Sequence, residues 1–488
     1  MDALRQLISI GIPWLAGAGI VCALQSRSRT PDAPGEIAWM LGVGYAVGAF
    51  VLTLWMRALS LAHVSFGILP VALPMLGLAV GSYWLAHRAS SGALVGKLRH
   101  GLRFVPADLD RSMVWVWWLL IAWIAARFLL LGVEVALRPL YPWDAWIQWA
   151  TKARVWYDLG YMAPFGRAEA WLNSPGAMYF DASPEYPPTM PLLQVWSCMV
   201  LGRWSDTLMN WPWWMLLLSL VLSIYGGLRS IGMGAATSLV AASFVATLPL
   251  ADVHVALAGY ADMPMAVYYT MAVLALLRWS GTRRRADAAI VALLAIACTQ
   301  IKNPGIVWAL TLVPGILVVV MPRTGLRIVA ALFAAAALLL AVFAQTNPII
   351  FNYRLHLDFN PDWAALGQTL FLLDNWHLLW YAVLVAAALA GRQLVEPALR
   401  TLTVVVIAGI LFLATVFGFT NASIWVSDQT TVNRAILHFA PVALVFAVVA
   451  FDAFTRRWYA RHPSAQDSHD QGAESAVARP SMPAALAP

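Results

Sequence analysis

Charged side chains concentrate in one stretch of this apolar sequence, residues 140–191. The sequence is 61% hydrophobic and only 11% charged, so a polar stretch of this length needs a functional or structural reason. Carboxylates can accept a proton from a hydroxyl group or bind a divalent cation, and ammonium and guanidinium groups can bind phosphate. The charged residues of the stretch are Asp144, Lys152, Arg154, Asp158, Arg167, Glu169, Asp181 and Glu185.

Asp144 is the leading candidate for chemistry because it heads this stretch, directly after Pro142 and Trp143, where a predicted helix leaves the membrane. It can act there as a general base or hold a divalent cation, or it can merely end the helix. Glu185 and Tyr186 border the next predicted helix. They can belong to the same site or to a solvated loop.

Three further candidates open or connect later predicted helices. Asp262, in YADMP, begins a helix and can either cap it or belong to a site. Lys302, in IKNPG, lies between two helix ends, where it can bind a phosphate or extend its ammonium group to the membrane surface. Arg434, in NRAILHFAP, opens the last predicted helix, where the helix dipole disfavours a cation. We therefore expect an anion beside Arg434, either a ligand or an acidic side chain.

The elements that must position these residues are membrane-spanning helices. The mean hydropathy is +0.72, and apolar runs of about 20 residues recur, each long enough to cross a bilayer. The sequence therefore predicts an all-α polytopic membrane protein with about 13 transmembrane helices. The predicted spans are residues 8–24, 37–56, 66–85, 113–137, 212–228, 233–250, 260–277, 288–301, 305–320, one ending near 343, 376–389, 402–419 and 436–451.

The basic residues predict the orientation of these spans. Arg and Lys lie mostly in short loops between apolar runs, such as those containing Arg27, Arg99 and Arg284, and loops of this kind face the cytoplasm. This places the N-terminus and residues 140–191 on the non-cytoplasmic side and the C-terminus in the cytoplasm. An endoplasmic reticulum membrane with a luminal outer side satisfies the same rule, but the short loops favour a bacterial inner membrane, in which that side is periplasmic. The net charge of +7 is then explained without a nucleic-acid partner.

Two short helices are predicted on the outer face. Trp146, Trp149 and Trp156 recur at helical spacing, on a different stripe from Asp144 and Lys152. An amphipathic helix of this kind is expected to lie in the membrane interface. Residues 191–201 are apolar but too short to cross a membrane, so they predict a second interfacial helix.

Two other features concern packing. Arg127 lies near the middle of the fourth predicted span, where an ionisable group costs about 2.5 to 3.5 kcal/mol, and we expect Glu134 to pair with it. The three cysteines, Cys22, Cys198 and Cys298, stand in apolar contexts without the spacing of a metal or redox motif. They predict no disulfide.

The ordered motifs resemble the GT-C superfamily of membrane glycosyltransferases, especially its branch of protein O-mannosyltransferases and lipid A aminoarabinose transferases. The resemblance covers residues 113–451. It is carried by WDAW around Asp144, EYPPTMPLL around Glu185 and Tyr186, YADMP around Asp262, IKNPG around Lys302 and NRAILHFAP around Arg434.

The resemblance implies a GT-C-type helical bundle with juxtamembrane helices on its outer face. It also implies transfer of a sugar from a polyprenyl-phosphate-linked donor to a lipid, glycan or protein acceptor at the periplasmic face, with inversion at the anomeric carbon. Asp144 would be the general base, and Lys152, Lys302 and Arg434 would surround the phosphate, with Asp262, Glu185 and Tyr186 in the substrate site. Asp144 and Asp262 are the candidate ligands for a divalent cation, Mg²⁺ or Mn²⁺, although this sequence has WDA where many relatives carry adjacent acids.

The chain divides into three predicted regions. Residues 1–111 contain three additional transmembrane helices and a basic cytoplasmic loop. Residues 112–455 form the GT-C-like catalytic module, with the outer loop 139–210. Residues 456–488 are expected to form a disordered cytoplasmic tail, because their Ser-, Ala- and Pro-rich composition cannot bury enough apolar surface to fold.

Two other functions stay open at this point. A polysaccharide polymerase or ligase that uses pyrophosphate-linked lipids would favour more basic outer loops, and the second predicted outer loop, residues 345–375, contains Arg354, His356 and Asp358. A transporter or flippase would place charged residues near the membrane midplane and repeat its hydropathy pattern in two halves. The sequence instead gathers its acidic residues at one predicted surface and has no visible repeat.

Overall fold

The computed structural model describes residues 1–26, 34–90, 105–343 and 359–462, together with residues 346–347, 349–350, 353–354 and 356–357. Within these ranges the chain is predominantly helical and contains two small two-stranded sheets. The predicted tail beyond residue 462, residues 91–104 of the basic loop, Arg27 and Asp358 lie outside the described residues. The predicted class, an all-α membrane protein, is confirmed.

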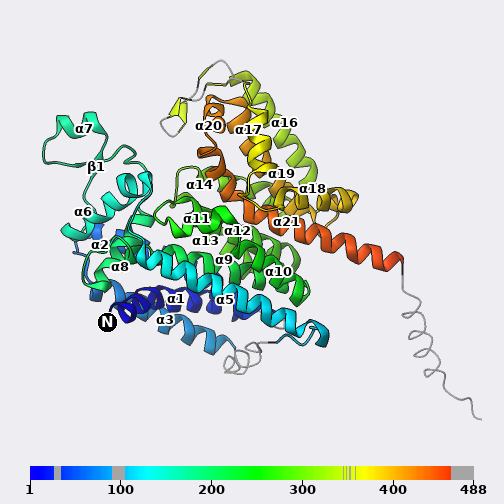
Figure 1. Ribbon diagram of the computed structural model, residues 1–488, viewed down its shortest axis with the longest axis horizontal. Helices are drawn as coiled ribbons and strands as arrows, with labels where there is room; N and C mark the ends of the chain where they lie inside the picture. Colours follow the sequence, from blue (N-terminus) through cyan, green and yellow to red (C-terminus); the bar gives the residue numbers. More distant parts are fainter. Residues whose placement is uncertain are drawn as a thin grey trace, which may run out of the picture.

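The first half of the chain contains three long helices, a fourth that leads into the polar stretch, and four that follow the stretch and return to the bundle. Strands β1 and β2 pair in parallel, and with α7 they project beyond the bundle (Figure 1). The elements are α1 (Asp2–Ser26), α2 (Glu36–Leu61), α3 (Ile68–Ala89), η1 (Arg111–Met113), α5 (Val114–Leu137), the π-helix η2 (Ala145–Ala150), α6 (Thr151–Leu159), β1 (Phe165–Gly166), α7 (Ala168–Asn173), β2 (Tyr179–Phe180), α8 (Thr189–Leu201), η3 (Leu208–Asn210), α9 (Trp211–Ser230), α10 (Ala235–Ala246) and α11 (Pro249–Ala256).

The second half begins with the central helix and ends with the longest one. Strands β3 and β4 pair in antiparallel fashion, and α16, α17 and α20 project on the same side of the bundle as α7 (Figure 1). The elements are α12 (Asp262–Thr282), α13 (Arg285–Thr299), α14 (Gly305–Leu310), α15 (Leu312–Val320), α16 (Gly325–Phe343), β3 (Ile349–Ile350), β4 (Tyr353–Arg354), α17 (Trp363–Gly367), the π-helix η4 (Gln368–Leu372), α18 (Leu379–Ala390), η5 (Gly391–Val395), α19 (Arg400–Phe419), η6 (Asn421–Ser423), α20 (Ile424–Ser427) and α21 (Thr431–Arg461).

Among the described residues, eight helices are long and apolar enough to cross a membrane, or nine if α10 and α11 count as one span bent by 53°. The predicted number of 13 is therefore not confirmed. The bend follows from Pro249 at the start of α11, since a proline favours an extended conformation of the preceding residue. The predicted span 305–320 is present as α14 and α15, which are separated only by Thr311 and together are too short to be counted among the eight helices. Counting apolar runs does not detect such breaks.

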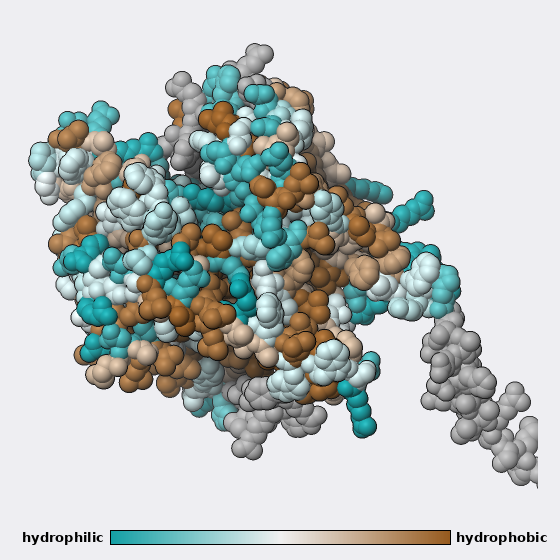
Figure 2. Space-filling view, viewed as in Figure 1, coloured by the Kyte–Doolittle hydropathy of each residue, from teal (hydrophilic) through white to brown (hydrophobic). Residues whose placement is uncertain are grey.

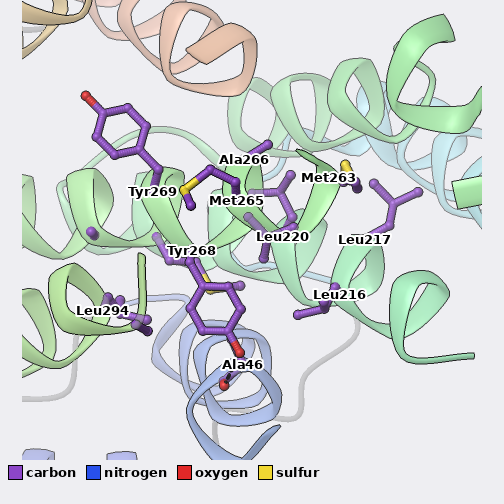
Figure 3. Close-up of a cluster of buried hydrophobic side chains, with 14 of the residues drawn as sticks. Ala46, Leu216, Leu217, Leu220, Met263, Met265, Ala266, Tyr268, Tyr269 and Leu294 are labelled. Carbon is purple, nitrogen blue, oxygen red and sulfur yellow. Dashed lines mark hydrogen bonds between the residues drawn. The ribbon is translucent and has the colours of Figure 1, made fainter. Parts of the chain in front are cut away.

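Helix α12 lies at the centre of the core, and side chains on all its faces are buried. Figure 3 shows Tyr268 and Tyr269, neighbours in sequence, pointing in opposite directions from it. The Tyr268 hydroxyl donates to the carbonyl of Ala46 in α2 at 2.6 Å, and the Tyr269 hydroxyl lies 2.7 Å from Oγ1 of Thr311. A buried tyrosine hydroxyl needs such a partner. These contacts orient α12 and thereby its first residue, Asp262.

The N-terminal helices are part of the same core. Helix α1 packs closely on α2. The two backbones are so near each other at Gly17 that a Cβ atom there would lie 1.9 Å from the carbonyl oxygen of Gly44. Helix α2 meets α9 in a similar way, since a Cβ atom on Gly226 would lie 2.3 Å from the backbone nitrogen of Trp39. Small residues permit this close approach of membrane helices. Helix α2 therefore supports α9 and α12 directly, and α1 and α3 pack behind it.

Charged residues mark the opposite end of α12. Arg278 pairs with Glu36 at 2.9 Å and with Asp287 at 3.2 Å, and it lies sixteen residues after Asp262, about 24 Å along the helix. Arg229, at the end of α9, pairs with Asp108 at 2.7 Å. In between, α5 exposes apolar side chains, and Figure 2 shows hydrophobic residues where α1, α3 and α5 lie in this view. An exposed apolar band between two charged ends fits a bilayer.

Several predictions for the polar stretch and its surroundings are wrong. Helix α8 has the predicted shortness, but nearly all its side chains are buried inside the protein instead of lying in the membrane interface. Trp149 and Trp156 are likewise buried, whereas Trp146 is 46% exposed. The hydrophobicity of a segment does not distinguish side chains that face lipid from side chains that are buried against other helices.

Two further predictions are corrected by the helix contacts. Arg127 pairs with Asp252 of α11, and the expected partner Glu134 pairs with Arg138. Helix α21 continues to Arg461, beyond the boundary predicted near residue 455, because its apolar and basic residues extend the helical pattern. The helical module therefore ends at Arg461, and residues 456–461 belong to it instead of to the predicted tail.

Candidate functional site

Asp262 is the centre of a polar cluster at one end of α12, and its side chain is fully buried. Its Oδ1 atom accepts hydrogen bonds from Nζ of Lys302 at 2.6 Å and from Nε2 of His438 at 2.9 Å. Its Oδ2 atom accepts from Nε of Arg434 at 2.9 Å. The capping interpretation is wrong, because Asp262 is the first residue of the helix and makes no cap hydrogen bond. Its carboxylate instead joins three segments of the chain.

Asp144 joins the cluster through Arg434. Nη1 of Arg434 donates to Oδ2 of Asp144 at 2.7 Å, so one guanidinium group bridges two carboxylates that lie far apart in sequence. The same guanidinium lies over the ring of Tyr260, 4.3 Å from its centroid, which adds a cation–π contact. The expected anion beside Arg434 is thus confirmed, and it consists of Asp144 and Asp262. Asp144 keeps 26% of its side-chain surface exposed and is the accessible acid of the cluster.

Lys302 lies in the turn between α13 and α14, and its side chain is only 12% exposed. Burial disfavours the ammonium form and lowers the pKa of Lys302, while the charge of Asp262 opposes that shift. The ammonium group is aimed inward at Asp262. It therefore does not extend to the membrane surface, which was the other interpretation of this lysine.

His438 was not singled out from the sequence. It follows Arg434 by four residues in α21, so both side chains lie on one face of that helix, and this spacing is the signal that could have identified it. The indole Nε1 of Trp308 donates to Nδ1 of His438 at 3.0 Å. Because an indole nitrogen only donates, Nδ1 must be the acceptor, and the proton of a neutral imidazole lies on Nε2, directed at Asp262.

A close backbone approach positions Asp144 against the start of α12. Gly259 has φ +118°, and a Cβ atom there would lie 2.5 Å from Cβ of Ala145, the residue that follows Asp144. Only glycine fits this conformation and this space without strain. The loop before α12 and the turn at Asp144 are therefore held together by backbone packing as well as by Arg434.

The cluster is electrically balanced. Asp144 and Asp262 contribute two negative charges, Lys302 and Arg434 contribute two positive charges, and His438 is neutral. Among the described residues, no group of three or more His, Cys, Asp or Glu side chains is placed to hold a metal ion. The predicted pair of metal ligands, Asp144 and Asp262, is bridged by a guanidinium, which a divalent cation would have to displace. The donor set does not fit Mg²⁺ or Mn²⁺ as it stands.

The other predicted site residues lie in separate contacts. Lys152 is 2% exposed and pairs with Asp181 at 2.6 Å, and its Nζ also donates to the carbonyl of Ser183 at 3.1 Å. Glu185 pairs with Arg167 at 2.7 Å. Tyr186 packs on Trp149, with ring centroids 5.2 Å apart. These contacts fold the polar stretch onto itself.

A second cationic position, also missed from the sequence, lies near the cluster. Arg57 of α2 donates to Oε1 of Gln300 and to Oγ1 of Thr189, both at 2.6 Å. Gln300 stands two residues before Lys302, so Arg57 and the cluster share one turn of chain. An arginine near the end of a transmembrane helix is a weak signal, because most such residues only anchor the helix.

Comparisons with known proteins add no assignment. No family model, no curated protein and no solved structure matches this chain. A functional assignment must therefore rest on the geometry and chemistry of the cluster.

Proposed function

We propose that this protein is an integral-membrane glycosyltransferase that moves a sugar from a polyprenyl-phosphate-linked donor to an acceptor hydroxyl. The observation that carries the proposal is the convergence of Asp144, Asp262, Lys302 and Arg434 at one end of the helical bundle. These are four of the residues on which the resemblance to the GT-C superfamily rests. They come from four separate segments, and ordinary helix packing does not require them to meet.

The acceptor chemistry needs one base. In the proposed reaction Asp144 takes the proton of the acceptor hydroxyl, whose oxygen forms a bond to the anomeric carbon of the sugar. The bond from that carbon to the phosphate oxygen breaks, and its electron pair leaves with the polyprenyl phosphate. Arg434 fixes Oδ2 of Asp144 at 2.7 Å, so the carboxylate is held in one orientation while part of its surface stays accessible. One displacement of this kind inverts the anomeric configuration.

Asp262 acts as a positioning residue in this scheme. It is fully buried and cannot reach an acceptor, but it holds the side chains of Lys302 and Arg434. A cation whose rotamer is already restrained loses less entropy when charge develops on a leaving phosphate. The proposed reaction needs no general acid, because a phosphate is a good leaving group and can depart without being protonated.

The environment of the cluster supports an amphiphilic substrate. The exposed apolar band of the bundle can accommodate a polyprenyl chain, while the polar cluster lies at the end of α12. Arg278 lies about 24 Å along α12 from Asp262, among the basic helix ends. Basic helix ends favour the cytoplasmic side, so the cluster would face the periplasm in an inner membrane. The acceptor, whether lipid, glycan or protein, would approach from the same side as the α7 region.

The test is sugar transfer, or slow donor hydrolysis, by purified protein with a panel of polyprenyl-phosphate sugars. Asp144→Asn should lower the rate by at least about 100-fold, because a positioned base contributes roughly 10² to 10⁴. The matched control is Asp158→Asn, which changes an exposed acid of the same polar stretch and should leave the rate unchanged. Equal turnover by wild type and Asp144→Asn would remove Asp144 as the base. No turnover by folded wild-type protein with any donor would count against the proposed class.

A further inference from the structure

Arg57 stands out because its charge is not neutralised. Both of its hydrogen-bond partners, Gln300 and Thr189, are neutral. Its Nε atom is buried and has no hydrogen-bond partner, and no carboxylate pairs with it, among the residues that the structure describes. By contrast, Lys302 and Arg434 are already matched by Asp262 and Asp144. Among the described residues, the guanidinium of Arg57 is therefore a partly buried cation near the cluster that no carboxylate pairs with.

The position of Arg57 places it at the same end of the bundle as the cluster. It lies one turn before the end of α2, whereas Glu36, at the start of that helix, pairs with Arg278 at the far end of α12. Its partner Gln300 lies two residues before Lys302, so the Cα atoms of Gln300 and Lys302 are at most about 8 Å apart. Arg57 thus lies close to the cluster but belongs to helices outside the resembling region, which begins at residue 113.

The geometry of the guanidinium is suited to an oxyanion. Nη1 and Nη2 each use one N–H bond, on Gln300 and on Thr189, and these two contacts fix the plane of the group. An arginine has five N–H donors in a planar fork, which matches the spacing of phosphate oxygens. Thr189 is also the first residue of α8, a helix of 13 residues, so the positive end of the α8 dipole faces the same place.

We propose that Arg57, held by Gln300 and Thr189, binds the phosphate group of a membrane lipid. Within the proposed function, on which this identification of the lipid rests, the phosphate is that of the polyprenyl donor or product. Lys302 and Arg434 then keep their place beside the leaving phosphate, each matched by a carboxylate, and Arg57 of the N-terminal helices supplies an additional positive charge that no carboxylate matches among the described residues. The binding of an anion would complete the charge balance around Arg57, and a half-buried unpaired cation is otherwise unfavourable in a membrane protein.

The experiment measures equilibrium binding of radiolabelled decaprenyl phosphate to the full-length protein in phosphatidylcholine nanodiscs. Arg57→Gln should raise the dissociation constant about 10-fold or more, since it removes charge-assisted hydrogen bonds. Arg57→Lys should give an intermediate value, because lysine keeps the charge without the fork. Arg203→Gln is the matched control, since Arg203 is exposed and pairs with Asp2, and its dissociation constant should equal that of wild type.

A stability measurement separates binding from a structural role. Without added lipid phosphate, Arg57→Gln should unfold at the same temperature as wild type or a higher one, because it removes an uncompensated charge. If Arg57 only joins α2 to α8, the variant will instead unfold at a lower temperature and bind decaprenyl phosphate as well as wild type does. That pair of results would overturn the inference. If Arg57→Gln does not fold, Arg57→Lys carries the comparison.

Competition identifies the source of the phosphate and keeps the two proposals distinguishable. Displacement by inorganic phosphate points to the phosphate group alone, and displacement by phosphatidylglycerol points to a general lipid headgroup. Binding that depends on Arg57 without any sugar transfer would support the phosphate site while the glycosyltransferase proposal fails. Sugar transfer that is equally efficient in wild type and Arg57→Gln, with equal dissociation constants, would reject the phosphate site alone.

Discussion

Replacing Asp262 with Asn removes the negative charge on which Lys302, Arg434 and His438 converge, while it preserves the shape of the side chain. Breaking a buried ion pair by removing one partner costs about 3 to 5 kcal/mol. Arg434 retains Asp144 and is 24% exposed, whereas Lys302 is 12% exposed and has Asp262 as its paired acid. We therefore expect the lower end of this range, about 3 kcal/mol of unfolding free energy.

Removing Lys302 as well provides a sharper test. Lys302→Met alone leaves Asp262 paired with Arg434 and should cost about 2 kcal/mol, the value of one charge-assisted hydrogen bond. In the double variant the uncompensated ammonium group is gone, so the total cost should stay near 3 kcal/mol instead of the sum of about 5. The coupling free energy between the two positions is then about 2 kcal/mol.

The assay is equilibrium unfolding of the four proteins in detergent micelles at pH 7. The control cycle uses Asp158 and Arg154, an exposed pair four residues apart in α6, for which we expect a coupling of at most about 0.5 kcal/mol. If the costs at Asp262 and Lys302 add within about 0.5 kcal/mol, the two residues are energetically independent. That result would refute the role of Asp262 as the centre of the cluster.

Two further predictions concern the segments around the cluster. Gly259→Ala should lower the unfolding free energy by about 1 to 3 kcal/mol and reduce sugar transfer, because the added Cβ atom meets Ala145. In the same unfolding assay the control Gly281→Ala, which has open space around it in α12, should raise the unfolding free energy by roughly 0.5 to 1 kcal/mol. Equal effects of the two substitutions would contradict the role of the close approach at Gly259. Burial lowers the pKa of Lys152 from its ordinary 10.5, and the charge of Asp181 opposes the shift. At pH values between the lowered pKa and 10.5, Lys152 is protonated in the unfolded chain but deprotonated in the folded protein. The stability of wild type relative to Lys152→Met should therefore rise with pH through that window, and a difference in unfolding free energy that is flat or falls would exclude this titration.

Part of the candidate site could be predicted from the sequence because charge is rare in this chain. Asp144, Asp262, Lys302 and Arg434 each interrupt an apolar context, and burying an ionisable group is costly enough that few such positions occur without a partner or a function. The anion expected beside Arg434 from the helix dipole likewise depends on local sequence, and it is confirmed. Apolar runs similarly determined the class of the protein, since no water-soluble fold buries so many of them.

Local patterns did not identify the partners. Lys152 shares a helical stripe with Asp144, yet it pairs with Asp181, because the polar stretch folds back on itself and buries the lysine there. His438 entered the cluster through a tertiary contact with Asp262, and Arg127 found Asp252 instead of the nearer Glu134. An ion pair depends on the distance between side chains in space, and the periodicity of one segment contains no information about another.

The sequence by itself determined that this is a helical membrane protein with a few costly charges in defined places. Only the tertiary structure decided which apolar runs are single helices, which are broken, and which charges meet. The contact between Arg434 and Asp144 joins residues separated by 290 positions. The same guanidinium also bonds Asp262 at the start of α12, which is buried from all sides, so Arg434 bridges the two carboxylates. The burial that makes these charges conspicuous in the sequence also forces them to pair, but the packing of the helices selects the partners.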